Sequence, residues 1–509
     1  MKQTGKGAII LPHGVLFRGN AEADIRRKII EKRWIKGIIS LPANLFYGTG
    51  IPACIIVLDK ADAETRQGIF MIDASKDFIK DGNKNRLREC DIKKIVDTFN
   101  NMIEIPKYSR FVPISEIAEK NEYNLNIPRY IDAQAAEDIQ DIRAHLNGGI
   151  PNFNIDELNK YWMAFPSART NLFSRYADGY SKLIPELENI KETIVESLDF
   201  IAYKNNYNKI FESWKQENKA TLLNIPLNTK PKKFIADLGE TVLDKYKFDK
   251  LIDKYAVYQL LMEYWQETMQ DDVYIISEIG YKIELQEHHE KKNKKDVVTY
   301  YNDLVPANLV ENRYFPDDIK LIQDKENELS EIQTQKEEFL EENCSEEGML
   351  NGLTVTYKKN VKGINQQVTE DLYDGDSMTK GKIEKFITAN KLNSKYSEEI
   401  ILLNKYLEIL SSETQLNKDI KDIKEKLYTK VIKKYTELTV DEVKTLVVDD
   451  KWLATLKNKF EEHLNDLTQS LSQRIKEVSL RYEATVAELE SRRETLKEKV
   501  QAHLALMGY

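Results

Sequence analysis

Residues 5–60 of the chain read GKGAIILPHGVLFRGNAEADIRRKIIEKRWIKGIISLPANLFYGTGIPACIIVLDK. This stretch holds three almost uninterrupted apolar runs, at residues 7–12, 34–42 and 53–60, and a segment between the first two that predicts a helix. Continuous apolar runs are typical of strands that are covered on both faces in an α/β sheet, because half-solvated strands alternate polar and apolar residues instead. The stretch therefore predicts three strands and one helix of an α/β sheet.

Three strands and one helix offer too few apolar neighbours to bury both faces of such a sheet. The first run begins at residue 7, and no earlier strand precedes it. We therefore expect the remaining strands to come from elsewhere. Two sources are open, namely a partner chain or a segment upstream of the first run that this sequence does not contain.

The composition limits the class of protein. A length of 509 residues is enough for roughly three domains. No stretch approaches the roughly 20 apolar residues that a membrane-spanning helix needs, and a net charge of −9 argues against a chain that grips DNA along its whole length. Cys54, Cys90 and Cys344 are scattered, which favours a reducing, cytoplasmic setting. His288 and His289 have no cysteine nearby and predict solvated surface rather than a metal site.

The sequence changes character after residue 132, where helical patterns begin to dominate. Tyr264, Trp265 and Met269 lie at helical spacing in an aromatic-rich stretch, which favours core packing over a cofactor site. We expect five regions: 1–132, the α/β sheet; 133–315, a helical domain; 316–346, a long amphipathic helix; 347–450, an irregular and helical connector; and 451–509, a C-terminal coiled-coil helix.

Three local patterns add detail to these regions. Ile139, Ile142 and Leu146 predict an apolar helix face, which the pair Gly148–Gly149 ends. The string QEHHEKKNKKD at residues 286–296 predicts an exposed charged loop. LTVTYKKN, which begins at residue 353, predicts a β-hairpin.

The last sixty residues carry a long apolar stripe. From Phe460 to Leu504 the apolar residues fall mostly at steps of four and three, with Arg493 as the polar interruption. Such a stripe is typical of a coiled coil or of a long bundle helix, and it needs a partner helix. The partner is either the helix at 317–346 of the same chain, which is the default, or another subunit.

Four blocks of the sequence resemble a known family. Residues 5–60, 68–81 (GIFMIDASKDFIKD), 83–91 (NKNRLRECD) and 123–132 (YNLNIPRYID) resemble the C-terminal half of the catalytic domain of N6-adenine DNA methyltransferases. More narrowly, they are similar to the modification (M) subunit of type I restriction-modification systems. The resemblance implies a partial Rossmann-like methyltransferase sheet at the N-terminus, followed by mainly α-helical domains and long coiled-coil helices.

The resemblance also implies an activity and a set of partners. The family transfers a methyl group from S-adenosylmethionine to adenine N6, in a DNA target that a separate specificity subunit chooses. We therefore expect DNA, the specificity subunit and the restriction subunit as partners, and no membrane. M subunits of the family pack C-terminal helices against the long helices of the specificity subunit.

Two motifs of the family have no counterpart in this chain. The glycine-rich loop that holds S-adenosylmethionine and the catalytic Asn-Pro-Pro-aromatic tetrapeptide both lie before the first apolar strand in the family. This sequence has no Pro-Pro dipeptide, and none of its close glycine pairs stands between a strand and a helix. We therefore expect an N-terminally truncated M subunit that is inactive alone. The alternative is a non-catalytic assembly module that docks on a specificity subunit or complements an N-terminal half-chain.

The loop between the second and third apolar runs carries the candidate base-binding residue. Enzymes that methylate adenine N6 flip the base out of the duplex and hold it between flat or apolar side chains. Phe46 and Tyr47 lie at the strand ends and are followed by Gly48 and Gly50, which let a backbone approach closely. A loop aromatic also commonly caps the core of its sheet. The resemblance favours base stacking for Phe46 and core packing for Tyr47.

Two further groups of residues are site candidates. Pro12, His13, Phe17 and Arg18 follow the first strand, at the edge where α/β sheets place their ligands, and we expect them to line the cleft. Gly82 and Asn83 predict a tight turn that presents Lys80, Lys84 and Arg86 to DNA phosphates. Solubility alone also explains surface lysines, so phosphate contact is the hypothesis to be tested.

Overall fold

A computed structural model describes residues 1–133, 138–292, 295–361 and 364–507. The chain divides into two compact units. Unit 1 consists of Met1–Glu278 and Trp452–Tyr509, and unit 2 consists of Ile279–Lys451. In sequence, unit 2 is therefore an insertion into unit 1, and each unit is described by itself.

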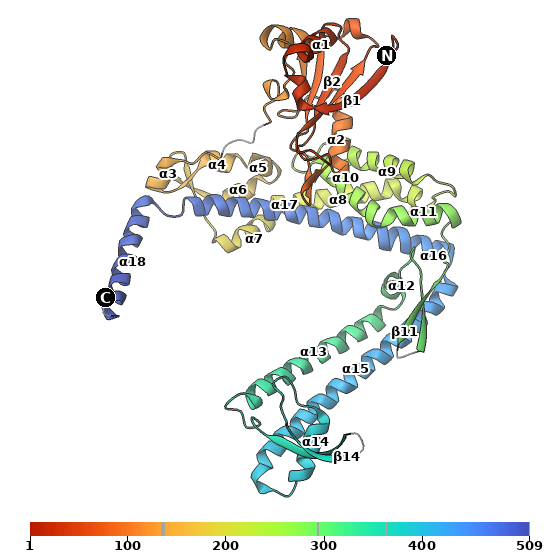
Figure 1. The fold of residues 1–509 in the computed structure, drawn as a ribbon, viewed down its shortest axis with the longest axis vertical. Helices are drawn as coiled ribbons and strands as arrows, with labels where there is room; N and C mark the ends of the chain where they lie inside the picture. The colour runs from red at the N-terminus through yellow and green to blue at the C-terminus, as the bar shows by residue number, and fades with distance from the viewer. Residues whose placement is uncertain (134–137, 293–294, 362–363, 508–509) are drawn as a thin grey trace. The chain divides into compact units, whose positions relative to one another are not determined.

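The N-terminal part of unit 1 is a mixed sheet with two main helices (Figure 1). Its elements are β1 (Lys6–Pro12), α1 (Asn20–Glu31), β2 (Ile35–Ser40), β3 (Ala53–Asp59), β4 (Gly68–Asp73), β5 (Ile79–Asp81), β6 (Lys84–Arg86), α2 (Glu89–Asn100) and β7 (Ser109–Pro113). Five strands pair in the order β1-β3-β2-β4-β7. The β2–β4 pair is parallel and the other pairs are antiparallel.

The strand directions bring three strand ends together. Because β3 lies antiparallel between β1 and β2, β1 runs parallel to β2 and β4. The carboxyl ends of β1, β2 and β4 therefore meet at one edge of the sheet, where open α/β sheets bind their ligands.

Successive residues of β2 and β4 point to opposite faces, and both faces are covered. The face covered by α1 and the segment 114–131 buries Leu16, Ile30, Ile35, Ile38, Cys54, Ile69, Met71, Val112, Ile117, Leu125, Ile127, Tyr130 and Ile131. The face covered by α2 buries Ile39, Leu41, Phe70, Ile72, Ala74, Ile95 and Tyr108. The prediction of strands buried on both faces is thus confirmed for β2, holds only in part for β3, and fails for the exposed β1. Burial also raises the pKa of the Cys54 thiol to about 11, as for a core residue.

Two strands of the sheet were not expected from this chain. β4 and β7 lie downstream of the three apolar runs and pair with the sheet beyond β2. The expectation that all further strands come from a partner or an upstream segment was therefore wrong on that side of the sheet. β7 has only five residues, Ser109–Pro113, which is too short for a periodic signal in the sequence.

The rest of unit 1 is mainly helical. Its elements are α3 (Ile142–Asn147), β8 (Ile150–Pro151), α4 (Asn152–Asp156), α5 (Asn159–Ala164), α6 (Pro166–Leu172), β9 (Phe173–Ala177), β10 (Tyr180–Leu183), α7 (Ile190–Val195), α8 (Leu198–Leu223), α9 (Pro231–Tyr246), α10 (Lys254–Tyr264), α11 (Gln270–Ile279), α17 (Ala454–Arg481) and α18 (Val486–Leu506). The last residue of α11 belongs to unit 2. Tyr264, Trp265 and Met269 are buried, as the core reading predicted. The sheet β8-β10-β9 was not predicted, because its strands are very short.

The C-terminal stripe is divided between two helices. α17 ends at Arg481 and α18 begins at Val486. The α17 part is buried within unit 1, where the Phe460 ring lies 5.3 Å from that of Phe211 on α8 and 5.9 Å from that of Tyr246 on α9. The α18 part is exposed. The prediction of one long C-terminal helix with a single partner helix is therefore wrong, because the stripe is divided between α17 and α18.

Unit 2 is built on two long helices. Its elements are β11 (Gln286–Lys292), β12 (Lys295–Tyr301), α12 (Ala307–Tyr314), α13 (Pro316–Cys344), β13 (Thr354–Val361), β14 (Ile364–Asp371), α14 (Lys380–Asn390), α15 (Ser397–Glu437) and α16 (Val440–Lys444). The long helix expected at 316–346 is α13, and it packs along α15 rather than along the C-terminal stripe. The predicted hairpin after residue 353 is β13–β14. Of the stretch predicted as a loop, residues 286–292 and 295–296 lie in the paired strands β11 and β12 instead, both histidines lie in β11, and residues 293–294 lie outside the described residues.

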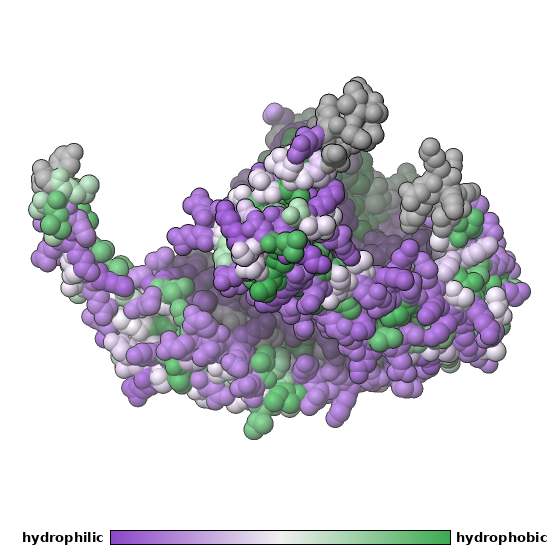
Figure 2. All heavy atoms as spheres, turned by 90° about the horizontal axis from the view of Figure 1, so that it is seen from below, coloured by the Kyte–Doolittle hydropathy of each residue, from purple (hydrophilic) through white to green (hydrophobic). Residues whose placement is uncertain are grey.

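The surface of the molecule agrees with its high charge. On the face that Figure 2 draws, hydrophilic side chains predominate and hydrophobic ones form small separate patches. Within the part of the chain that the structure describes, every helix is too short or too polar to cross a bilayer.

Candidate functional site

The carboxyl edge of the sheet gathers three polar side chains. His13 directly follows β1, Ser40 ends β2 and Asp73 ends β4. The Ser40 hydroxyl lies 3.2 Å from His13 Nε2. One Asp73 carboxylate oxygen accepts a hydrogen bond from the Ser75 amide at 3.0 Å. The His13–Ser40 contact joins the ends of β1 and β2, whereas the Asp73 hydrogen bond is local to the end of β4.

His13 is held in its neutral form. Burial lowers the pKa of its imidazole, and the Ala53 backbone and the Asp73 charge oppose that shift only in part. A neutral imidazole has one donor and one acceptor nitrogen, so it can hydrogen-bond to Ser40 in either direction. His13 therefore serves as a fixed hydrogen-bonding group near pH 7 rather than as a cation.

The loop 43–50 extends from the end of β2 along this edge. Phe46 is half-buried and packs with Leu45 against the core on the α2 side. Tyr47 is 93% exposed. The predicted core packing of Tyr47 is therefore wrong, because its neighbour Phe46 already fills the position against the core. The base-stacking role of Phe46 stays a prediction.

The three predicted phosphate ligands do not converge. In the β5–β6 hairpin, Lys80 pairs with Asn85, whereas Lys84 and Arg86 lie two residues apart on the opposite face. Lys80 is exposed, and within the described ranges it has no ion pair or hydrogen bond. Lys84 Nζ instead donates to backbone oxygens of the loop 43–50, and Arg86 Nε lies 3.2 Å from an Asp81 carboxylate oxygen.

The other predicted cleft residues surround the end of β1. Pro12 and Phe17 are exposed. The Arg18 side chain lies over Gly14, where an added Cβ would come within 2.6 Å of Arg18 Nε. Arg18 also pairs with Glu22 at 3.7 Å on the solvent side. The structure thus groups Pro12, His13, Phe17 and Arg18 at one strand end, and their role in a cleft stays a prediction.

The outer edge of β1 is open. β1 pairs with β3 on one side, and no strand in the described part of the chain pairs with its other side. Ile9 is 47% exposed and Ile10 is 53% exposed. Adjacent strand residues point to opposite faces, so apolar side chains are uncovered on both faces at this edge. Native proteins usually cover or charge such an edge, because it is ready to pair with another strand.

A second apolar surface lies on α3 and α18, which are in contact. Its exposed side chains are Ile139, Ile142, Leu146, Val486, Leu489, Leu496, Val500 and Leu504. The predicted helix face forms only in part, because α3 begins at Ile142 and Ile139 lies before it; its side chains are exposed, and α3 ends before Gly148 as expected. We name this the α3–α18 surface.

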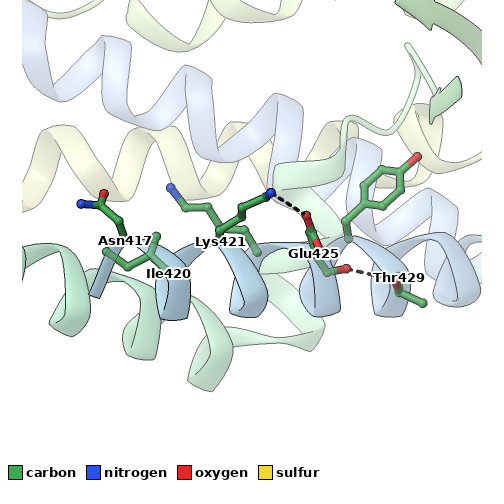
Figure 3. A pocket seen from close by; sticks show the side chains of 7 residues that line it. Asn417, Ile420, Lys421, Glu425 and Thr429 are labelled. Atoms are coloured by element: carbon green, nitrogen blue, oxygen red, sulfur yellow. Dashed lines mark hydrogen bonds and ion pairs between the residues drawn. The ribbon is translucent and has the colours of Figure 1, made fainter. Parts of the chain in front are cut away.

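Other features of the structure offer no comparable chemistry. Among the described residues no group of His, Cys, Asp and Glu is arranged to hold a metal ion. A groove along α15 in unit 2 is lined by Asn417, Ile420, Lys421, Lys424, Glu425, Tyr428 and Thr429 (Figure 3). Lys421 and Glu425 of the groove pair with each other at 3.7 Å, and Lys424 pairs with Glu326 on α13 at 2.7 Å, so these charges are already paired.

Sequence reasoning missed Ser40, Asp73 and Asn85. The first two had a signal, because each is the polar residue that ends an apolar run, at the position where parallel strands place site residues. Asn85 had none, since its role depends on which loop lies beside it.

Comparisons with known proteins place the N-terminal region. Residues 1–139 match the family described as N-6 DNA Methylase. A 146-residue stretch is 43% identical to the methylase subunit of the type I restriction enzyme MjaVII from Methanocaldococcus jannaschii, over 28% of this chain and 25% of that protein. A 156-residue stretch is 34% identical to the MpnII methylase subunit from Mycoplasma pneumoniae, over 31% of this chain and 27% of that protein.

Solved structures give a partial likeness of the same kind. The type I restriction-modification methyltransferase subunit from Streptococcus thermophilus is 44% identical, over 26% of this chain and 28% of that one, with a TM-score of 0.24. The chain thus spans about a quarter of the length of the relatives it matches. Its N-terminal region is related to N6 DNA methylases, and its relatives are methylase subunits of type I restriction enzymes.

Proposed function

We propose that this chain is part of a type I modification methyltransferase that methylates adenine N6 in DNA once further strands complete its sheet at β1. The methyl donor is S-adenosylmethionine, and a separate specificity subunit selects the DNA target. The chain alone does not methylate in this proposal, because the cofactor loop and the Asn-Pro-Pro-aromatic tetrapeptide come with the added strands.

The open edge of β1 is the observation that supports this proposal. Ile9 and Ile10 are exposed on opposite faces of a strand whose neighbours β2 and β4 are buried. Burying apolar surface stabilises an assembly by about 25 cal/mol per Å², and a paired strand also satisfies the free backbone groups of β1. A complementing segment gains both contributions when it adds to this edge.

The turn from β1 into α1 does not form a cofactor-binding loop by itself. The turn from β1 into α1 contains Gly14 and Gly19, but the Arg18 side chain fills the space beside Gly14. Within that turn only Gly19, at the start of α1, has open space beside it, which is less than the glycine-rich loop that the family resemblance implies for the cofactor. We accordingly assign cofactor binding to the complementing segment and no cofactor contact to the residues described here.

The loop 43–50 supports a role in holding the target base. It lies at the carboxyl edge and carries two adjacent aromatic rings, of which Phe46 rests on the core and Tyr47 is exposed. An aromatic ring beside a flipped base stabilises it by about 1–3 kcal/mol. Phe46 is the stacking residue that the family resemblance implies, and Tyr47 is the more accessible ring.

Assembly with a complementing segment tests the proposal. The 509-residue chain is co-expressed with a segment that carries the glycine-rich loop and the tetrapeptide, and with the specificity subunit. Transfer of labelled methyl groups to adenine in DNA is then measured. We expect methylation with the assembly and none with the chain alone. An Ile10→Asp variant, which places a charge on the β1 edge, should fail to assemble, whereas the surface control Lys2→Asp should assemble normally.

A second candidate function is a non-catalytic assembly module that docks on the specificity subunit. The α3–α18 surface favours it, because a narrow apolar stripe on a helix is stabilised by a partner helix. Two results together select this candidate over the first. The purified specificity subunit binds this chain and fails to bind its Leu489→Glu and Leu496→Glu variants. Complementation gives no methylation.

A further inference from the structure

The β5–β6 hairpin holds the loop 43–50 through two adjacent residues. Lys84 Nζ donates to the Phe46 carbonyl at 3.1 Å and to the Thr49 carbonyl at 3.4 Å. Asn85 Nδ2 donates to the Ala43 carbonyl at 2.7 Å, and the Asn85 amide donates to the Asn44 carbonyl at 3.0 Å. These four hydrogen bonds reach the beginning, the middle and the far side of the loop.

The hairpin is itself a defined unit. Gly82 adopts a φ of +61°, which allows the tight turn at its tip. The Asp81–Arg86 ion pair joins its two strands, and Leu87 directly after β6 packs on the same core as Phe46. The donors on Lys84 and Asn85 are therefore presented from a fixed position.

The loop has few other restraints. Within it, the Asn44 amide donates to the Gly50 carbonyl at 3.3 Å, and the Ile51 amide donates to the Thr49 hydroxyl at 3.1 Å. Gly48 stands at a φ of +81° directly after the exposed Tyr47. Hydrogen bonds from an ammonium group are about twice as strong as neutral ones. Lys84 is consequently the strongest single restraint on the backbone between Phe46 and Thr49.

We infer that Lys84 and Asn85 are positioning residues that fix the aromatic loop 43–50 against the carboxyl edge of the sheet. The half-buried Lys84 ammonium is engaged with the loop, so this role differs from the direct phosphate contact predicted from the charge pattern. The identity of the ligand that meets the loop rests on the proposed function. The restraint on the loop does not.

Amide hydrogen exchange on the full 509-residue chain tests the restraint itself. Lys84→Met keeps the aliphatic stem and removes the donor, and Asn85→Asp is isosteric but sets an oxygen against the Ala43 carbonyl. We expect exchange of the hydrogen-bonded amides at the loop, those of Asn44, Ile51 and Asn85, to accelerate about tenfold or more in both variants, as for the loss of a hydrogen bond to a charged group. Lys80→Met, whose exposed side chain makes no hydrogen bond to the loop within the described residues, should leave the loop unchanged, and β2 and β4 should stay protected throughout.

The assembled enzyme tests the consequence for the reaction. In the complemented assembly, Lys84→Met should lower kcat about tenfold while the Kd for S-adenosylmethionine stays constant, since misplacing a substrate-holding group slows turnover. Lys84→Arg, which keeps a donor, should restore part of that kcat. Unchanged loop exchange in Lys84→Met would overturn the restraint. A loosened loop with unchanged kcat would overturn its role in the reaction. An inactive unmodified assembly would instead count against the proposed function, and the exchange result would still decide the restraint.

Discussion

The imidazole of His13 lies 3.2 Å from the hydroxyl of Ser40, although strand β3 separates the strands that carry them. β1 and β2 run parallel on either side of β3, so their carboxyl ends come out at the same edge. The His13–Ser40 contact therefore joins two strand ends across the strand between them. It ties the open strand β1 to the buried part of the sheet.

The burial of His13 makes the sheet sensitive to mild acid. Burial lowers the pKa of His13 below its ordinary value of 6.5, so the unfolded chain binds a proton more readily than the folded one. The resulting stability is fully present above pH 6.5 and is lost as the pH falls from 6.5 through the folded pKa. Amide-exchange protection of β2 and β3, corrected for intrinsic rates, should be lower at pH 5.5 than at pH 7.5. His463 on α17 shifts in the same direction and adds a separate effect there.

The variant His13→Gln isolates the contribution of His13. Glutamine does not titrate, so the variant should lose less protection in β2 and β3 between pH 7.5 and pH 5.5 than the unmodified chain. His463→Gln serves as the matched control and should leave the pH dependence of these strands unchanged. Equal losses in the His13→Gln variant and the unmodified chain would refute the assignment.

Gly37 in β2 has no room for a side chain. An added Cβ would lie 2.5 Å from the Phe99 ring and 2.7 Å from the backbone oxygen of Phe70 in β4. The neighbouring strand cannot move away without breaking the sheet, so Gly37→Ala should destabilise it by about 1–3 kcal/mol, as for other overpacked cores. Gly19→Ala meets no atom within 4 Å and should change stability by less than about 0.5 kcal/mol. The opening free energies of the β2 and β4 amides measure both, and equal effects of the two variants would contradict the packing described here.

Alanine variants of Phe46 and Tyr47 should differ in their effects on the stability of the sheet and on methylation. Phe46→Ala removes a ring that packs on the core, so it should lower the stability of the sheet as well as methylation. Tyr47→Ala removes a ring that is 93% exposed, so stability should not change. In the complemented assembly Tyr47→Ala should lower methylation about 10- to 100-fold if its ring stacks on the base, by the energy of one stacked base. Normal methylation in Tyr47→Ala would leave Phe46 as the stacking residue.

An ion pair couples the two long helices of unit 2. Lys336 Nζ on α13 lies 2.8 Å from a Glu413 carboxylate oxygen on α15, and both side chains are mostly buried. Glu413→Lys places two like charges together and should destabilise the helix pair by about 1 kcal/mol. The double variant Lys336→Glu with Glu413→Lys should recover most of that loss, as a double-mutant cycle measures. Chemical unfolding followed by amide exchange in α13 gives the unfolding free energies of the unmodified chain, the two single variants and the double variant. If the effects of the two single variants simply add in the double variant, the two side chains are not coupled.

The sequence was most informative where burial is high. β2 is a continuous apolar run because both of its faces are packed, and the family resemblance fell on the same region. β1 has the same kind of run, yet it is exposed, because among the described residues it pairs with a strand on one side only. An apolar run in the sequence shows that a strand is suited to burial on both faces. It does not show whether other parts of the protein cover those faces.

The C-terminal stripe shows a different limit. The break between α17 and α18 contains neither Gly nor Pro, so the apolar steps continued across it. A signal was nevertheless present, because Thr485 and Glu488 form a capping box that starts α18. The loop restraint by Lys84 had no such local signal. The charge cluster located the hairpin, but only the tertiary structure places the ammonium group against the carbonyls of Phe46 and Thr49.

Titration calorimetry with S-adenosylmethionine tests most directly whether cofactor binding by this protein depends on strands added at β1. The 509-residue chain alone should give no saturable heat of binding, and the same chain assembled with a segment that carries the glycine-rich loop and the tetrapeptide should give a saturable isotherm. Ile10→Asp should abolish the second result by blocking assembly. Saturable micromolar binding by the chain alone would contradict the account.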